Sequence, residues 1–209
     1  MPGPADRGKR RRGSCIVVDM TQPLAVTFCA GGTGAWAIER IVAIRGEALP
    51  AAARLDMALD IALDMATGAP AVPGEAWRLR GVVSNTRYTT ASELKTLAPA
   101  SPPLGRPEAT CAALIPIGKS AAWWAMAQDE RRQVFEERSG HIARSLRYLP
   151  AVARRLHHAR DLGGPFDFLT WFEFAPENAP AFDALLADLR ASEEWNWVER
   201  EVEVRLRRA

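Results

Sequence analysis

The spacing of apolar residues near the C-terminal end predicts a strand, a helix and a second strand. Residues 166–174 read FDFLTWFEF, and such an aromatic run favours a strand. Residues 182–189 carry apolar side chains at helical spacing, which predicts an amphipathic helix; these are Phe182, Leu185, Leu186 and Leu189. Residues 198–208 alternate as strands do. We expect one face to carry Val202, Val204 and Leu206, and the other Glu201, Glu203 and Arg205.

The segments before this region also carry clear patterns. Residues 150–160, PAVARRLHHAR, alternate like a strand, and the DLGGP that follows predicts a turn. Residues 129–148 predict one long helix. The proline-rich stretches 67–77 and 97–107 are typical of loops.

The N-terminal half predicts three further strands and a helix. The strands are expected at residues 24–30, 77–88 and 110–119. Residues 49–68 predict a helix ending at Gly68, since apolar residues recur there at helical spacing; these are Leu55, Leu59, Ala62, Leu63 and Ala66. Helices on one face of antiparallel strands define the α+β class, here with ferredoxin-like antiparallel sheets.

The segment AGGTGAWA matches the spacing of a dinucleotide-binding turn, with Gly32, Gly34 and Ala37 at the motif positions. The next residues, WAIERIVAI, resemble a strand rather than the helix that such a turn needs. We therefore interpret the segment as a glycine-rich hairpin.

Charge is concentrated at the N-terminus. The formal net charge is +2, but residues 1–12 alone carry about +4, so the remainder is slightly acidic and does not favour nucleic-acid binding. An export signal is disfavoured because Asp19 interrupts the apolar run after the basic residues. We expect a disordered basic tail at residues 1–20, no membrane span and a cytoplasmic protein. Cys15, Cys29 and Cys111 have neither disulfide nor metal-ligand spacing and are expected to be reduced thiols.

The three histidines differ in what they can do. His157 and His158 are neighbours on a predicted strand and face opposite ways, so they do not chelate one ion together. No pattern of zinc ligands surrounds them. His141 stands alone on the predicted helix, where a single axial histidine would suit haem. The alternative is that His141 is an ordinary buried histidine that binds no ligand.

Several separated segments together resemble the chlorite dismutase family, most closely its short, dimeric bacterial type. In order they are IPIGKSAAWW, QDERR, HIARSLRYLPAVARRLHHARDLGGPFDFLTWFEF and SEEWNWVEREVEVRL. The resemblance runs from about Leu24 to the C-terminus. It implies a dimeric α+β barrel with a truncated ferredoxin-like subdomain at 21–108 and a haem-binding one at 109–209. It also implies haem b, a homodimer and chlorite as a small anionic substrate.

The resemblance also implies roles for individual residues. His141 matches the proximal haem ligand, and Glu194 matches the carboxylate that accepts a hydrogen bond from it. Arg154 is similar to the distal catalytic arginine, and strand alternation places it on one side with Leu156 and away from Arg155. The remaining expected residues of the haem pocket or the proximal network are Tyr88, Ile115, Lys119, Trp123, Trp124 and Leu156. Which tryptophan contacts the porphyrin is left open.

The implied reaction is the decomposition of chlorite to chloride and dioxygen, with O–O bond formation from transient hypochlorite and ferryl haem. The runner-up is a coproheme decarboxylase-like enzyme of haem synthesis, which would carry a tyrosine where Ile115 stands and an uncharged residue in place of Arg154. A non-catalytic haem-binding protein is a further alternative. A dye-decolorising peroxidase-like enzyme is disfavoured because its distal aspartate and glycine motif is not visible.

Overall fold

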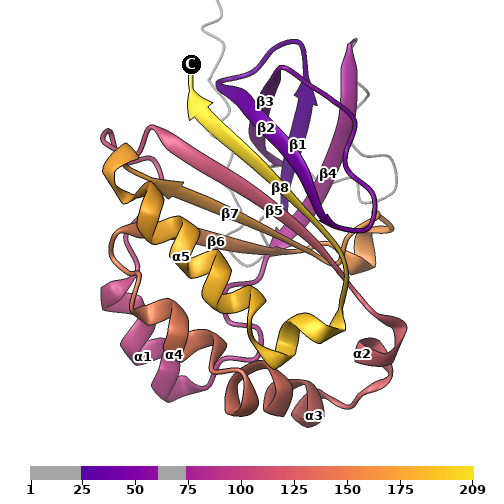
Figure 1. Cartoon of the computed structure of the whole chain (residues 1–209), viewed down its shortest axis with the longest axis vertical. Helices are drawn as coiled ribbons and strands as arrows, with labels where there is room; N and C mark the ends of the chain where they lie inside the picture. Colours follow the sequence, from indigo (N-terminus) through magenta and orange to yellow (C-terminus); the bar gives the residue numbers. More distant parts are fainter. Residues whose placement is uncertain (1–24, 61–73) are drawn as a thin grey trace, which may run out of the picture.

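The computed structural model describes residues 25–60 and 74–209, and its strands close into a barrel (Figure 1). Every pair of neighbouring strands is antiparallel. The strands are β1 (Ala25–Gly31), β2 (Trp36–Arg45), β3 (Arg54–Asp60), β4 (Glu75–Val83), β5 (Cys111–Lys119), β6 (Val152–His158), β7 (Phe168–Phe174) and β8 (Val198–Arg208). Their order around the barrel is β1, β3, β2, β8, β5, β7, β6 and β4.

The helices gather outside the half of the barrel formed by β5 to β8 (Figure 1). The α-helices are α1 (Ala91–Ala100), α2 (Ala121–Ala125), α3 (Gln128–Arg132), α4 (His141–Leu146) and α5 (Ala179–Arg190). Shorter turns are the π-helical η1 (Gln133–Arg138) and the 3₁₀ segments η2 (Arg160–Leu162), η3 (Pro176–Asn178) and η4 (Glu193–Trp197). Over residues 25–60 and 74–209, none of the helices has the length and apolar character of a membrane span.

The α+β prediction is confirmed, and most of the predicted elements are present. The expected strands correspond to β1, β4, β5, β6, β7 and β8, and the amphipathic helix to α5. The division into subdomains at residue 108 stays a prediction. The basic tail and Cys15 lie outside the described residues.

The predicted helix at residues 49–68 is wrong where the structure describes it, because residues 54–60 form β3. This strand pairs with β1 along its whole length. Leu55 is fully buried in the barrel core. Residues four apart lie on one face of a helix, but they also lie on one face of a strand, so the Leu55 and Leu59 spacing did not separate the two. Ala62, Leu63, Ala66 and Gly68 lie outside the described residues.

The glycine-rich hairpin is also wrong, although β2 is the strand that we expected. β1 and β2 are not partners, because β3 lies between them in the barrel. Gly34 has a φ of 148°, and a Cβ there would come within 2.5 Å of the Leu55 backbone. Glycine is therefore needed for close passage over β3.

The predicted long helix at residues 129–148 is divided into α3, η1 and α4. The interruption before α4 lies at Gly140, which adopts the left-handed conformation with φ 60° and ψ 38°. Helix α1 was not predicted and extends into the expected loop 97–107. Its start has a capping box, in which Thr90 and Glu93 satisfy each other's backbone N–H groups. The T-x-x-E spacing is the signal that would have found it.

Two apolar layers lie on either side of the β5–β8 wall. The barrel interior contains Phe28, Trp171 and the predicted apolar face of β8. The other layer lies between the sheet and α5. Glu201 and Glu203 face this second layer, where Arg190 Nη2 donates to both carboxylates at 2.7 and 2.8 Å. Buried charges are tolerated there because they are paired.

Candidate functional site

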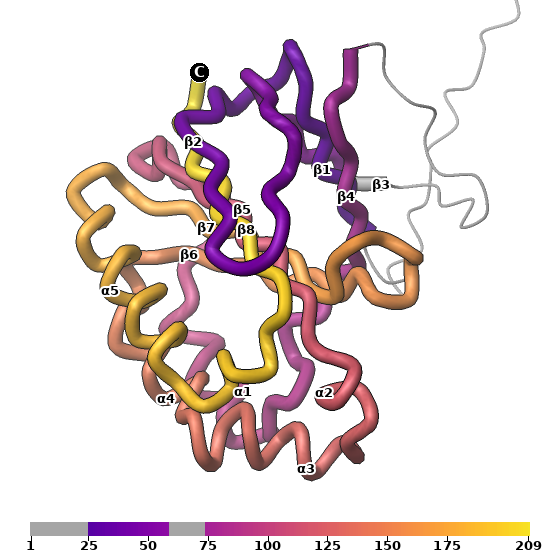
Figure 2. The backbone as a smooth tube through the Cα atoms, turned by 45° about the vertical axis from the view of Figure 1, so that its right-hand side comes forward, coloured from indigo at the N-terminus to yellow at the C-terminus, as the bar shows by residue number. Residues whose placement is uncertain are grey.

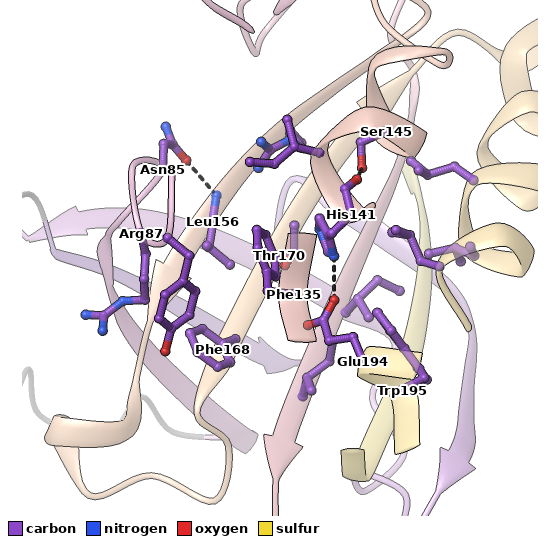
Figure 3. Close-up of a pocket in the computed structure, with 18 of the residues that line it drawn as sticks. Asn85, Arg87, Phe135, His141, Ser145, Leu156, Phe168, Thr170, Glu194 and Trp195 are labelled. Carbon is purple, nitrogen blue, oxygen red and sulfur yellow. Dashed lines mark hydrogen bonds and ion pairs between the residues drawn. The ribbon is translucent and has the colours of Figure 1, made fainter. Parts of the chain in front are cut away.

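A deep pocket opens between the outer face of the sheet and the helices (Figure 3). Its empty space is roughly 940 Å³, open solvent at its mouth included. Strands β5, β6 and β7 form one wall, and the rest comes from α2, α4, α5, η1, η4 and the loop at 85–89. The pocket therefore lies where residues from distant parts of the chain meet.

The pocket brings together eight of the nine sequence-predicted site residues. These are Tyr88, Ile115, Lys119, Trp123, His141, Arg154, Leu156 and Glu194. The ninth, Trp124, is not among the lining residues, and its indole Nε1 donates to Asp167 at 3.1 Å. Trp123 is buried, and its Nε1 has no hydrogen-bond partner in the part of the chain that the structure describes.

His141, Glu194 and Lys119 form a hydrogen-bonded chain at the base of the pocket. The His141 Nδ1 atom lies 2.7 Å from one Glu194 oxygen, as the dashed line in Figure 3 marks. Lys119 Nζ donates to the other Glu194 oxygen at 2.7 Å. A carboxylate at Nδ1 favours the tautomer that carries its proton there, which leaves Nε2 with a free lone pair.

Glu194 is buried, yet its surroundings favour the charged form. Burial alone would raise the pKa of this carboxyl. The charge of Lys119, with the hydrogen bonds from His141 and Lys119, outweighs burial and lowers the pKa to about 2. Glu194 is therefore an anion through the working pH range.

Replacing Glu194 by Gln is expected to weaken haem binding by about 10- to 100-fold, the usual cost of losing a group that orients a metal-ligating histidine. Glutamine has nearly the same volume as glutamate, but it lacks the negative charge that pairs with buried Lys119. Titration of apoprotein with haem measures the effect. Glu193→Gln is the matched control, because Glu193 is more exposed and pairs with Arg138. Equal affinities of the two variants would contradict the prediction.

Arg154 enters the same pocket from β6. Its Nε is buried and has no hydrogen-bond partner within residues 25–60 and 74–209. Burial lowers the pKa of this guanidinium, but arginine keeps its charge at neutral pH. A buried cationic group with unused donors is suited to an anionic ligand.

The remaining walls are mostly apolar and aromatic. Phe168, Thr170 and Phe172 face the pocket from β7, as alternation of FDFLTWFEF predicts. The Phe135 ring stacks on His141, with centroids 4.4 Å apart and an angle of 25° between planes. Our site prediction missed Phe135 and Asn85. No local signal marks either, since both reach the pocket through tertiary folding.

The adjacent histidines are not pocket residues. His157 is fully buried against Phe28 inside the barrel, and its Nδ1 lies 3.0 Å from the Leu169 carbonyl oxygen. Burial lowers its pKa to about 4. His158 lies beside Trp124 and Phe168, with Asp161 3.5 Å from its Nδ1. No group of metal-ligating side chains occurs among the residues described in the structure.

His157 is expected to make stability depend on pH. The unfolded chain takes up a proton near pH 6.5, whereas the folded histidine resists protonation until about pH 4. Folding therefore loses about 3 kcal/mol as the pH falls through this window. Urea unfolding between pH 7 and 4 measures the slope. His157→Gln should flatten it by nearly one proton, and an unchanged slope would contradict the assignment.

The site fits a planar, metal-containing cofactor such as the expected haem. His141 Nε2 would be free to bind the iron, and the cation of Arg154 is not neutralised by any carboxylate within salt-bridge distance among the described residues. Aromatic and aliphatic side chains supply the apolar surroundings that haem needs. Fold and pocket together define an α+β barrel with a histidine-containing pocket between the sheet and the helices.

Comparison with known proteins identifies the family. The family model for chlorite dismutase matches residues 62–207, so the chain belongs to the chlorite dismutase family. The chain is similar to the dimeric chlorite dismutase of Nitrobacter winogradskyi, with 52% sequence identity and a TM-score of 0.78. That alignment covers 88% of this chain and 99% of the Nitrobacter chain.

More distant structures share the fold. A chlorite dismutase variant from Candidatus Nitrospira defluvii is 20% identical with a TM-score of 0.61, covering 90% of this chain and 92% of that one. The Nitrospira enzyme in complex with imidazole is also 20% identical, with a TM-score of 0.58, covering 89% and 92%. At this identity the similarity supports the barrel fold alone.

Proposed function

We propose that this protein uses haem b to decompose chlorite to chloride and dioxygen. The observation that carries the proposal is the meeting of His141, backed by Glu194, with the unpaired cationic Arg154 in one apolar pocket. Membership in the chlorite dismutase family and the similarity to the Nitrobacter enzyme support the same reaction.

On the proximal side, His141 would bind the iron through Nε2. Glu194 accepts the Nδ1 hydrogen bond and, as a buried anion, makes the imidazole a stronger electron donor. Lys119 balances the carboxylate charge and fixes its orientation. When bound, the haem supplies the oxygen-transfer chemistry, while the protein supplies geometry and electrostatics.

On the distal side, Arg154 would hold the anions. Its guanidinium offers forked donors to the oxygens of chlorite and keeps its charge throughout. The reaction conserves both oxygen atoms, because ClO₂⁻ gives Cl⁻ and O₂. Arg154 would also retain the transient hypochlorite, which must stay close for O–O bond formation.

Ile115 argues against the decarboxylase alternative. It lines the pocket and is buried, and it occupies the position where the resemblance would require a reactive tyrosine. An aliphatic side chain has no phenol to oxidise.

The test is oxygen evolution from chlorite by purified, haem-loaded protein, followed with an oxygen electrode. We expect one O₂ and one chloride for each chlorite consumed. Haem-replete protein that evolves no oxygen would refute the function. A second protein ligand on the iron, seen in the electronic spectrum, would instead favour a non-catalytic haem-binding protein.

The proposal includes assembly as a homodimer and action in the cytoplasm. Dimerisation is supported by the Nitrobacter enzyme, which is described as dimeric. Light scattering after size exclusion measures the mass, and a monomeric mass at micromolar concentration would contradict this part.

A further inference from the structure

Glu194 lies on the short turn η4, and an arginine from the distant strand β2 holds the end of this turn. We propose that Arg45 is a positioning residue for the Glu194–His141 pair. The inference rests on the proposed role of His141 as iron ligand, but not on the identity of the substrate.

Arg45 makes two contacts that define the end of η4. Its Nη1 donates to the carbonyl oxygens of Trp195 and Val198 at 2.7 and 2.9 Å. The Trp195 carbonyl also accepts from the Val198 N–H at the end of the turn, so Arg45 adds a second donor and a positive charge from β2 at this end. Figure 2 shows β2 running beside β8, the strand that follows η4.

Other contacts hold the rest of η4 to the segment before α4 and to β8. Arg45 joins η4 to β2. The Glu194 backbone N–H donates to the buried Ser139 hydroxyl at 2.8 Å. The Trp195 indole donates to Glu201 at 2.7 Å, and Glu201 is the cross-strand partner of Arg45. Glu194 thus sits between an anchor near His141 and an anchor on β2 and β8.

Small displacements of η4 would matter because the carboxylate has two fixed partners. Both its contacts, to His141 Nδ1 and to Lys119 Nζ, are 2.7 Å long. Hydrogen bonds weaken steeply when their angle is lost, and functional geometry tolerates only about 0.5 Å. Releasing the Trp195 and Val198 carbonyls would loosen the residue next to Glu194.

Arg40 provides a matched control. It also lies on β2 and also reaches β8, where its Nη2 bonds Glu203 at 2.8 Å. It makes no hydrogen bond to η4 among the described residues. Both arginines precede residues 62–207, which the family model matches. A general loss of stability should therefore affect both variants, whereas a positioning effect should appear only for Arg45.

The experiment compares haem-loaded wild type, Arg45→Gln, Arg45→Lys and Arg40→Gln. The rate of haem loss to excess apomyoglobin is expected to rise about tenfold in Arg45→Gln, the lower end of effects from groups behind a metal ligand. The iron–histidine stretching band of the ferrous protein should shift to lower frequency, because the imidazole loses anionic character. Arg45→Lys should recover part of both, and Arg40→Gln should match wild type.

Each outcome decides a specific point. An unchanged band and haem-loss rate in folded Arg45→Gln would overturn the positioning role, as would equal effects in Arg40→Gln. If Arg45→Gln does not fold, Arg45→Lys against Arg40→Lys tests the same difference at smaller amplitude. Wild-type protein without an iron–histidine band would overturn both the inference and the ligand assignment. A normal band without oxygen evolution would refute only the chlorite reaction.

Discussion

Replacing His141 by alanine is expected to abolish stable haem binding. Among the described residues, His141 is the histidine that lines the pocket, and its Nδ1 is already engaged by Glu194 at 2.7 Å. Alanine removes the axial nitrogen and also leaves the Glu194 anion without one of its two partners. We expect haem affinity to fall at least about 100-fold, beyond the usual cost of losing only an orienting group.

Haem titration followed by absorbance measures this loss, with added imidazole as a rescue. The cavity left by the His141 ring would admit free imidazole, which should restore part of the binding. His158→Gln is the control, since His158 lies beside Trp124 and is not a lining residue. Unchanged haem affinity in His141→Ala would reject the ligand assignment.

Replacing Arg154 by alanine is expected to reduce chlorite turnover while leaving haem binding nearly intact. A hydrogen bond to a charged group contributes about 1.5–3 kcal/mol, so kcat/KM should fall about 10- to 150-fold. Hypochlorite should also escape more often and bleach the haem, because nothing cationic holds it. Oxygen yield, trapped hypochlorite and the loss of haem absorbance measure the three effects.

The neighbouring arginine supplies the control. Arg155 is not a lining residue, and its charge acts on His157 within the barrel. Arg155→Ala should therefore keep the wild-type oxygen yield. Arg154→Lys keeps the charge without the fork, and we expect an intermediate yield. Equal turnover in Arg154→Ala and wild type would remove Arg154 from the mechanism.

Strand alternation carried much of the correct prediction. In VARRLHH it separated Arg154 from Arg155, and the two now prove to face different sides of β6. The same period of two explains why Phe168, Thr170 and Phe172 face the pocket together, although we had assigned no faces within FDFLTWFEF. Periodicity misled us at β3, where we predicted a helix, because the spacing of Leu55 and Leu59 fits both the helical and the strand period.

The sequence by itself determined the class of the fold, most of its strands, helix α5 and, through the family resemblance, the candidate ligand. Local periodicity is enough for this, since it reflects which face of one element is buried. The resemblance also paired Glu194 with His141, but only the tertiary structure shows how the two meet across 53 positions and how Lys119, 75 positions from Glu194, bonds its second oxygen. The tertiary structure also decided that Trp123 lines the pocket and that Arg45 reaches η4. Such contacts depend on how β2, β5, α4 and η4 come together, and no local pattern encodes that distance.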